Sequence, residues 1–196
     1  MATLSRLYDD YETASTVVRA LENAGVPAGD ISLISNNAEG RIRTSSADGT
    51  GTGDAAGAGA GVGAMVGGAA GLLAGLGMIA IPGIGPVVAA GWLASTLVGA
   101  AAGGAAGGIL GALSEAGIEE SDAPVYAEGL RRGGAIVTVR VSDADRLRVE
   151  NLLDRSSVNL PERAATYRSA GWTGFDPAAP YPVDRDRDIL NKPRTF

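Results

Sequence analysis

Two glycine-rich stretches dominate the chain: residues 55–75, AAGAGAGVGAMVGGAAGLLAG, and residues 87–111, VVAAGWLASTLVGAAAGGAAGGILG. Both lie within residues 55–114, where no side chain is charged. Small residues recur at every fourth position, which places them on one face of a helix and lets a second helix approach closely. This glycine-zipper pattern predicts helix packing and oligomerisation through Gly59, Gly63, Gly67, Gly71, Gly75, Gly91, Ser95, Gly99, Gly103, Gly107 and Gly111.

A turn separates the two stretches, at Pro82, Gly83, Gly85 and Pro86. Proline stops a helix from continuing, and glycine accepts the positive φ of a tight reversal. The whole segment, residues 55–114, is therefore expected to be a helical hairpin, with helices over residues 60–81 and 87–113. At ~1.5 Å per residue, each helix is long enough to cross a hydrocarbon layer of ~30 Å.

The segment before the hairpin predicts a strand, a helix and a second strand. Residues 3–8 and residues 31–35 have the composition and alternation of strands. Gly25 ends the helix between them. The apolar positions of this helix recur at helical spacing, at Ala14, Val17, Val18, Leu21 and Ala24.

The same order returns after the hairpin. Residues 135–141 alternate as a strand, Ser142 or Asp143 begins a helix, and residues 158–160 form a weak closing strand. Two such β-α-β halves predict a ferredoxin-like sandwich, in which four strands form one sheet with helices on one face. The two halves then meet in space, because neither half can bury its apolar face alone.

The expected fold class is α+β, a ferredoxin-like split β-α-β sandwich interrupted by a long glycine-zipper helical hairpin. Its halves are residues 1–35 and 115–160, separated by a flexible linker over residues 36–54 and the hairpin. Residues 161–196 form an extended tail with prolines and aromatic residues. Since the halves fold together, both ends of the hairpin lie on one side of any membrane.

Composition excludes several classes of function. The chain has 196 residues, no histidine and no cysteine, so it supplies no Cys/His zinc site, thiol nucleophile, Ser-His-Asp triad or disulfide. A net charge of −6 and a pI near 4.7 lack the basic footprint of nucleic-acid binding. We therefore expect no catalytic, cofactor-binding or metal site, no nucleic-acid partner, and a non-enzymatic role.

Two short motifs are too incomplete to change this expectation. Gly59, Gly61 and Ala64 nearly match a dinucleotide-binding fingerprint, but no strand precedes them. A series of carboxylates, Asp184, Asp186 and Asp188, resembles the start of a calcium loop. Ile189 replaces its turn glycine, and Thr195 replaces its bidentate glutamate. A solvated, charged tail is the better interpretation.

The residues after the hairpin carry a family resemblance. The pattern comprises Gly117, Ile118, Glu119, Glu120, Tyr126, Gly129, Gly133 and Gly134, and it leads into the strand at residues 135–141. It resembles the bacterial general stress protein 17M-like (heat-induced stress protein) domain. Residues 20–31 are similar to the N-terminal half of that domain, and residues 171–177 to the tails that follow it. The resemblance implies a stress-linked, non-enzymatic role and brings no catalytic residues.

Three interpretations of the hairpin remain open. It forms the interior of a large homo-oligomer, it inserts into a membrane, or it folds on its own sheet or stays a linker. Glycine and alanine contribute little free energy to membrane insertion, which favours self-assembly of the hairpin. The expected partners are other copies of the chain and, in the second interpretation, lipid. We expect a self-assembling, stress-response structural protein, cytoplasmic or inner-membrane-associated with both termini on the cytoplasmic side. The alternative function is a small-molecule-sensing regulatory domain with a membrane hairpin anchor.

Two local features have alternative interpretations of their own. Trp92 is either an anchor at a membrane interface or a core aromatic residue beside the hairpin bend. Arg131 and Arg132 either contact anionic lipid headgroups or occupy an ordinary helix C-terminus.

Overall fold

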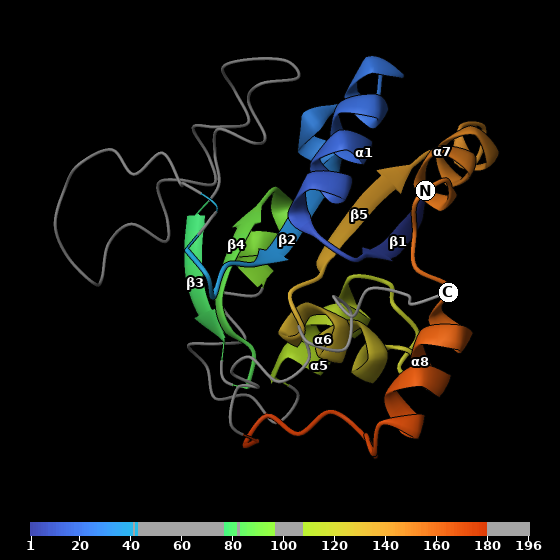
Figure 1. Ribbon diagram of the computed structural model, residues 1–196. Helices are drawn as coiled ribbons and strands as arrows, with labels where there is room; N and C mark the ends of the chain where they lie inside the picture. The colour runs from blue at the N-terminus through green and yellow to red at the C-terminus, as the bar shows by residue number, and fades with distance from the viewer. Residues whose placement is uncertain (41, 43–76, 82, 97–107, 180–196) are drawn as a thin grey trace, which may run out of the picture.

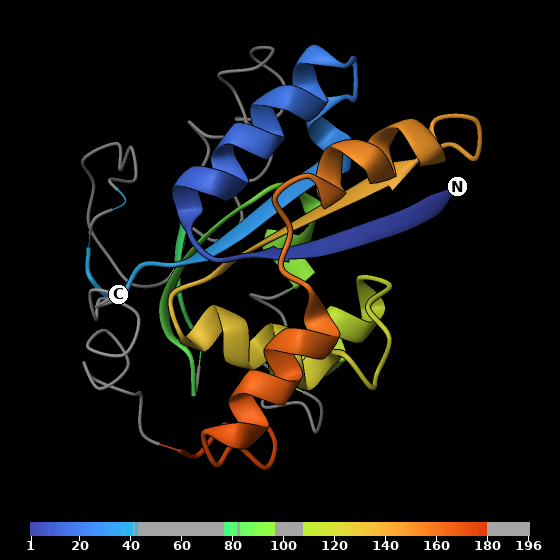
Figure 2. The ribbon, with the colours of Figure 1, turned by 45° about the vertical axis from the view of Figure 1, so that its right-hand side comes forward.

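A computed structural model describes residues 1–40, 42, 77–81, 83–96 and 108–179. These residues form an α+β fold, in which one open antiparallel sheet has helices on both faces (Figures 1 and 2). The five strands are β1 (Ala2–Tyr8), β2 (Ile31–Asn36), β3 (Gly77–Ile81), β4 (Gly85–Ala90) and β5 (Ala135–Val141), in the order β1-β5-β2-β4-β3. The α-helices are α1 (Tyr11–Asn23), α5 (Gly108–Glu115), α6 (Ala123–Arg131), α7 (Arg146–Asp154) and α8 (Leu160–Ser169).

The first strand, helix and strand follow the local sequence signals. Asp10 caps α1, because its carboxylate accepts a hydrogen bond of 2.7 Å from the backbone N–H of Thr13. Gly25 adopts φ +86° just after the helix, a conformation that favours glycine. The apolar face of α1 is buried as its periodicity predicts, through Ala14, Val17, Val18 and Leu21.

Strand β5 lies between β1 and β2 and runs antiparallel to both. Its Val139 is opposite Leu4 of β1, and its Val137 is opposite Leu33 of β2. The residues before and after the glycine-rich segment therefore meet in one sheet, as the sequence predicts. Strand β5, which comes from far along the chain, therefore lies between the two strands of the β1-α1-β2 unit.

The predicted closing strand at residues 158–160 is wrong. Leu160 begins α8, and the Asn159 side chain caps this helix by accepting a hydrogen bond of 3.2 Å from Glu162 N–H. Pro161 in the first helical turn has no N–H to offer to a sheet. One strand-like contact remains, since Val158 N–H donates 2.8 Å to Leu7 O. The tail predicted over residues 161–196 is likewise helical up to Ser169.

The predicted helices over residues 60–81 and 87–113 are wrong at residues 77–81 and 87–90, which lie in strands β3 and β4. The reversal itself is confirmed: Ile84 N–H donates 3.1 Å to Ile81 O, and Gly83 and Gly85 adopt φ +77° and +91°. Pro86 is the second residue of β4 rather than the end of a turn, and Pro82 lies outside the described residues. Strand β4 pairs with β2, whose outer backbone groups otherwise lack partners.

Helical structure does occur later in the segment, over residues 92–96 and in α5. The other glycine-zipper positions fall outside the described residues: Gly59, Gly63, Gly67, Gly71, Gly75, Gly99, Gly103 and Gly107. Within the described part of the chain, no helix combines the length and hydropathy needed to cross a bilayer.

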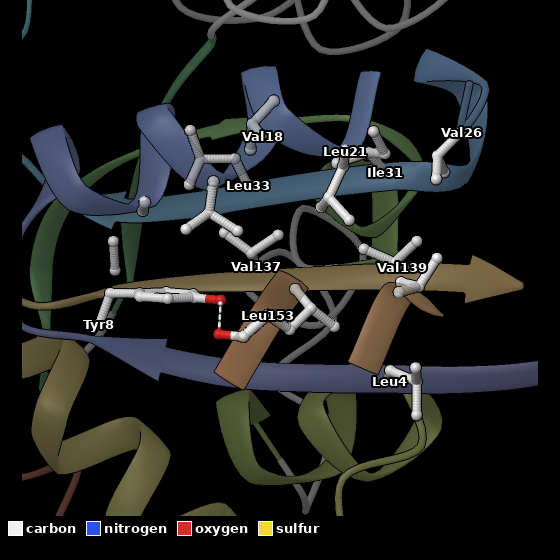
Figure 3. Close-up of a cluster of buried hydrophobic side chains, with 14 of the residues drawn as sticks. Leu4, Tyr8, Val18, Leu21, Val26, Ile31, Leu33, Val137, Val139 and Leu153 are labelled. Carbon is white, nitrogen blue, oxygen red and sulfur yellow. Dashed lines mark hydrogen bonds between the residues drawn. The ribbon is translucent and has the colours of Figure 1, made fainter. Parts of the chain in front are cut away.

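The sheet separates two apolar cores. The first core lies between the sheet and helices α1 and α7, and Figure 3 shows its side chains, among them Leu33, Val137 and Leu153. The second core lies on the other face, where Leu7, Ile34 and Ile136 pack against α5 and α6. Helices therefore cover both faces of the sheet, and the expectation that they cover one face is wrong.

Both cores are possible because the central strands are apolar on both sides. Strand β2 is buried from Ile31 to Ser35, and β5 is buried at six of its seven positions, all but Arg140. Helix α8 packs outside α6 through a smaller cluster of Val125, Ala164 and Tyr167.

Candidate functional site

Strand β3 forms one edge of the sheet and has little cover. Its residues Gly77, Met78 and Ala80 are exposed, and Met78 keeps 59% of its surface in contact with solvent. Among the residues that the structure describes, no strand pairs with its outer side. Edge strands usually carry charges or prolines that prevent further pairing, and β3 (GMIAI) has neither.

The register identifies the backbone groups on this outer side. Pro86 O accepts a hydrogen bond of 2.8 Å from Asn37 N–H, so the carbonyl group of Pro86 faces the β2 side of β4. Pro86 is opposite Ala80, and this pair therefore does not exchange hydrogen bonds. Backbone groups alternate along a strand, so the N–H and C=O groups of Ala80 and Met78 point away from the sheet.

The two faces of β3 differ. Ile79 and Ile81 lie on the side of α5 and α6, where Ile81 is buried and Ile79 packs partly buried against the second core. Met78 and Ala80 lie on the opposite side and are exposed. The outer edge of β3 thus offers unpaired peptide groups beside a half-covered isoleucine.

Gly91 has a role different from the predicted one. Its φ is +86°, and a Cβ atom there would lie 2.2 Å from Ile31 O and 2.6 Å from the Ser32 hydroxyl oxygen. Ser32 Oγ also accepts a hydrogen bond of 3.0 Å from Leu93 N–H. Gly91 therefore lets the chain after β4 approach β2, and its assignment to a helix-packing face is wrong.

The other two described zipper positions are on helical segments. Ser95 is exposed, and its hydroxyl donates 2.7 Å to Trp92 O. A Cβ atom added at Gly111 would meet nothing within 4 Å. In the described part of the chain these positions do not form a packed glycine face, so helix packing through them stays a prediction.

The Trp92 side chain packs against the second core and is not an exposed anchor. It packs partly buried against the second core, and the Arg140 guanidinium carbon lies 4.7 Å from its ring centroid. This geometry favours the core interpretation that the sequence left open.

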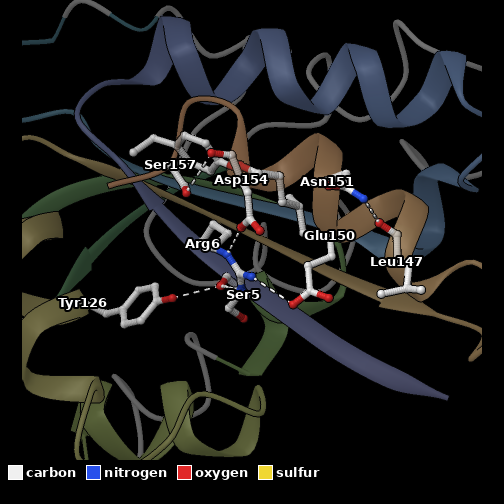
Figure 4. A network of polar contacts seen from close by, with 10 residues as sticks. Ser5, Arg6, Tyr126, Leu147, Glu150, Asn151, Asp154 and Ser157 are labelled. Carbon is white, nitrogen blue, oxygen red and sulfur yellow. Dashed lines mark hydrogen bonds and ion pairs between the residues drawn. The ribbon is translucent and has the colours of Figure 1, made fainter. Parts of the chain in front are cut away.

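A polar network joins β1 to helices of both faces (Figure 4). Arg6 donates 2.5 Å to Asp154 and 3.3 Å to Glu150, both on α7. On the other face, the Tyr126 hydroxyl donates 2.9 Å to Ser5 O. Arg6 links β1 to α7 and Tyr126 links β1 to α6, so these contacts hold helices on the sheet.

A buried charge cluster on α6 was missed by the sequence analysis. The Glu128 carboxylate is fully buried and pairs with Arg131 Nη2 at 2.8 Å and with Arg132 Nε at 2.6 Å. The Arg132 guanidinium also lies over the Tyr167 ring, 4.5 Å from its centroid. The spacing of Glu128 from the two arginines, three and four positions along a helix, is the signal that could have revealed the cluster.

Arg131 is the unusual member of this cluster. Only 9% of its surface is exposed, and its Nε and Nη1 atoms are buried without a hydrogen-bond partner in the described residues. The Phe175 ring lies 5.7 Å away and covers part of the guanidinium group. The arginines thus face the interior and Tyr167 at the end of α6, which favours the helix C-terminus interpretation over contact with lipid headgroups.

Within the described residues, no group of three or more acidic side chains is arranged to hold a metal ion. Comparisons with protein-family models, curated proteins and solved structures give no match to this chain. The outer edge of β3 and the α6 cluster are the two candidate sites of this chain.

Proposed function

We propose that this protein is a non-enzymatic structural protein that assembles into homo-oligomers through its charge-free segment, residues 55–114. The observation that carries the proposal is that β3, a part of this segment, is an uncharged and exposed edge strand. An exposed apolar edge is a template for association with another chain. Charged residues on an edge strand prevent such association, and β3 has none. This is expected of a protein that assembles and not of one that stays monomeric.

The glycine-zipper positions are the second part of this proposed interface. Faces without side chains allow close helix packing, either in a protein interior or in lipid. The open space at Gly111 is compatible with a helix from a neighbouring copy. Both chain termini lie on one side of any membrane in this proposal, because one sheet joins the segments before and after residues 55–114.

We further infer that β1, α1, β2, β5 and α7 are the ferredoxin-like part of the fold. The insertion of β5 between the two strands of the β1-α1-β2 unit supports this assignment. A role in the bacterial stress response rests on the resemblance to the general stress protein 17M-like domain.

Sedimentation of the full chain over a range of concentrations tests the proposed assembly. We expect a particle larger than a monomer, with a mass that grows with concentration. Replacing Gly67, Gly71, Gly103 and Gly107 with leucine should reduce its size, because the added side chains separate helices that pack closely. A monomer at every concentration, with and without detergent, would contradict the proposal.

A regulatory domain that senses a small anion is the second candidate. The observation that favours it is the buried Arg131, whose Nε and Nη1 groups have no hydrogen-bond partner in the described residues. A buried guanidinium with free donors is stabilised by a carboxylate or phosphate group.

Thermal unfolding with inorganic phosphate or a small dicarboxylate tests this second candidate. Binding to the native state raises the melting temperature, and at a hundredfold excess over Kd it stabilises by about 2.7 kcal/mol. Arg131→Lys keeps the charge but loses the planar donors, so it should abolish the response. An equal response in Arg131→Lys, or none in the natural chain, would argue against an anion at this site.

A further inference from the structure

We propose that β3 pairs with β3 of a second copy of the chain, antiparallel and across a two-fold axis at Ile79. The pairing joins two five-stranded sheets into one continuous sheet. This inference rests on the proposed self-assembly and specifies one of its interfaces.

The backbone of β3 specifies the register of this pairing. Met78 and Ala80 carry the outward N–H and C=O groups, as the pairing of Ala80 with Pro86 shows. An antiparallel register that places Met78 opposite the partner's Ala80 makes both such pairs hydrogen-bonded. It satisfies all outward peptide groups of the two described strands, whereas a shift by two residues leaves some without partners.

The same register brings apolar side chains together. Ile79 then faces the partner's Ile79 in a pair without hydrogen bonds, where Cα atoms are about 4.5 Å apart. Both isoleucines lie on the α5 and α6 side of the sheet, where Ile79 is only partly buried in one copy. Pairing covers this residue and extends the second core across the two-fold axis.

The charge pattern favours a second copy over other occupants. No charged residue occurs from residue 55 to residue 114, so a charged partner strand would lose hydration and gain no ion pair at this edge. An identical uncharged strand has no such cost. A two-fold axis also makes the contact self-complementary and closes it at a dimer of sheets.

The C-terminal tail is the competing occupant within the same chain. Residues 170–179 lead to the β3-β4 turn, because a Cβ atom on Gly83 would lie 2.5 Å from the Cα atom of Pro177. The following residues, PYPVDRDRDI over positions 180–189, contain two prolines and five charges. Proline lacks the N–H of a ladder and the charges suit solvent, so this sequence is a poor partner for β3.

Cysteine cross-linking tests the register, because the natural chain has no cysteine. Ile79→Cys should form a disulfide-linked dimer under mild oxidation, since the two Cα atoms at the axis lie within the bonding range of about 4.4–6.8 Å. Leu147→Cys is the matched control, because Leu147 is 73% exposed on α7, which packs near the opposite edge of the sheet. We expect at least about a tenfold faster cross-link for Ile79→Cys, as an estimate from this geometry.

Met78→Cys distinguishes the registers. In the proposed register the two Met78 positions are diagonal neighbours about 7–8 Å apart, which is too far for a disulfide without backbone movement. Met78→Cys should therefore cross-link more slowly than Ile79→Cys. The reverse order would overturn the Ile79 axis in favour of one at Met78.

Ala80→Pro tests the hydrogen bonds without disturbing the fold. It removes an outward N–H group that β4 does not use, so the thermal transition of the monomer should persist. Each dimer loses two hydrogen bonds at about 0.5–1.5 kcal/mol each, so its Kd should rise at least about fivefold. Sedimentation measures Kd, and circular dichroism checks the fold.

The outcomes separate this interface from the proposed function. A chain that assembles without an Ile79→Cys cross-link, and whose assembly is unchanged by Ala80→Pro, would contradict the β3 interface alone. A chain that stays monomeric contradicts both. If Ile79→Cys cross-links only after deletion of residues 180–196, the tail occupies the edge in the full chain and the second copy does not.

Discussion

The hydroxyl group of Tyr126 on α6 donates a hydrogen bond of 2.9 Å to the backbone carbonyl oxygen of Ser5 on β1 (Figure 4). On the other face of the sheet, the Tyr8 hydroxyl donates 2.9 Å to Leu153 O on α7 (Figure 3). Both tyrosines are buried, Tyr126 at 3% and Tyr8 at 0% exposure. Two buried phenols thus connect the edge strand β1 to a helix on each face.

We predict that the free energy of unfolding falls as the pH rises above 10. Burial raises the pKa of Tyr126 to about 12, and it also raises the pKa of Tyr8. Unfolded tyrosines lose their protons near pH 10, so above that pH the native state binds more protons than the unfolded state. The stabilisation that comes from these raised tyrosine pKa values is fully present below pH 10. Above pH 10 the free energy of unfolding falls by up to about 1.4 kcal/mol per pH unit for each residue, and the contribution of Tyr126 is lost as the pH approaches 12.

Denaturant unfolding at a series of pH values measures this slope. Tyr126→Phe should flatten it between pH 10 and 12. At pH 7 the same variant should lose about 0.5–1.5 kcal/mol, because it removes one hydrogen bond while Arg6 Nη1 still donates 2.9 Å to Ser5 O. A slope that is the same in both proteins would show that Tyr126 titrates alike in the folded and unfolded states.

Gly91→Ala is expected to destabilise the protein by about 2–5 kcal/mol, because the new Cβ atom clashes with Ile31 O in a strained φ. Gly111→Ala is the matched control on α5, where a Cβ atom meets nothing within 4 Å. In the monomer it should stabilise the helix by about 0.5–1 kcal/mol. Thermal unfolding of the two variants measures the difference. A destabilised Gly111→Ala would instead indicate a tightly packed neighbour at that glycine.

Glu128→Gln should cost about 3–5 kcal/mol, since it removes the buried negative charge that pairs with Arg131 at 2.8 Å. Glu150→Gln serves as the control, because Glu150 is 31% exposed and pairs with Arg6 at 3.3 Å. A change of at most about 1 kcal/mol is expected there. Equal effects in urea denaturation would mean that burial of the Glu128 cluster adds nothing to its stability.

Deletion of residues 55–113, replaced by a Gly/Ser bridge, should abolish the cooperative thermal transition. The deletion removes β3 and β4, and it also removes Leu93, Ile109 and Leu113 from the second core. Deletion of residues 55–76 retains all of these and should preserve the transition, because it leaves the described strands, helices and core side chains in place. If the larger deletion still melts cooperatively, the two outer strands are dispensable for the fold.

The elements before and after the glycine-rich segment could be predicted because their signals are local. Alternation identifies β5, helical spacing identifies the buried face of α1, and the caps at Asp10 and Gly25 mark its ends. The false strand at residues 158–160 had weak alternation only, and Asn159 followed by Pro161 is the stronger signal for a helix start.

The candidate site could be located in part. The sequence indicated the uncharged segment 55–114 and the reversal around Gly83, and both remain central to the proposed interface. It did not show that β3 is an edge strand or that Arg131 is buried. Both properties depend on which elements lie beside these residues, and residue spacing along one chain does not carry that information.

The sequence by itself determined the α+β class, the meeting of residues 1–35 with residues 135–141, and the position of the tight reversal, because apolar periodicity and glycine conformation act locally. Only the tertiary structure decided the conformation of residues 77–90. Short runs of Gly, Ala, Val and Ile fit a buried helix and a strand equally well. The outer edge of β2 needed hydrogen-bond partners for its peptide groups, and β4 supplies them. The peptide groups of β2 that needed partners therefore favoured a strand over a helix at residues 85–90.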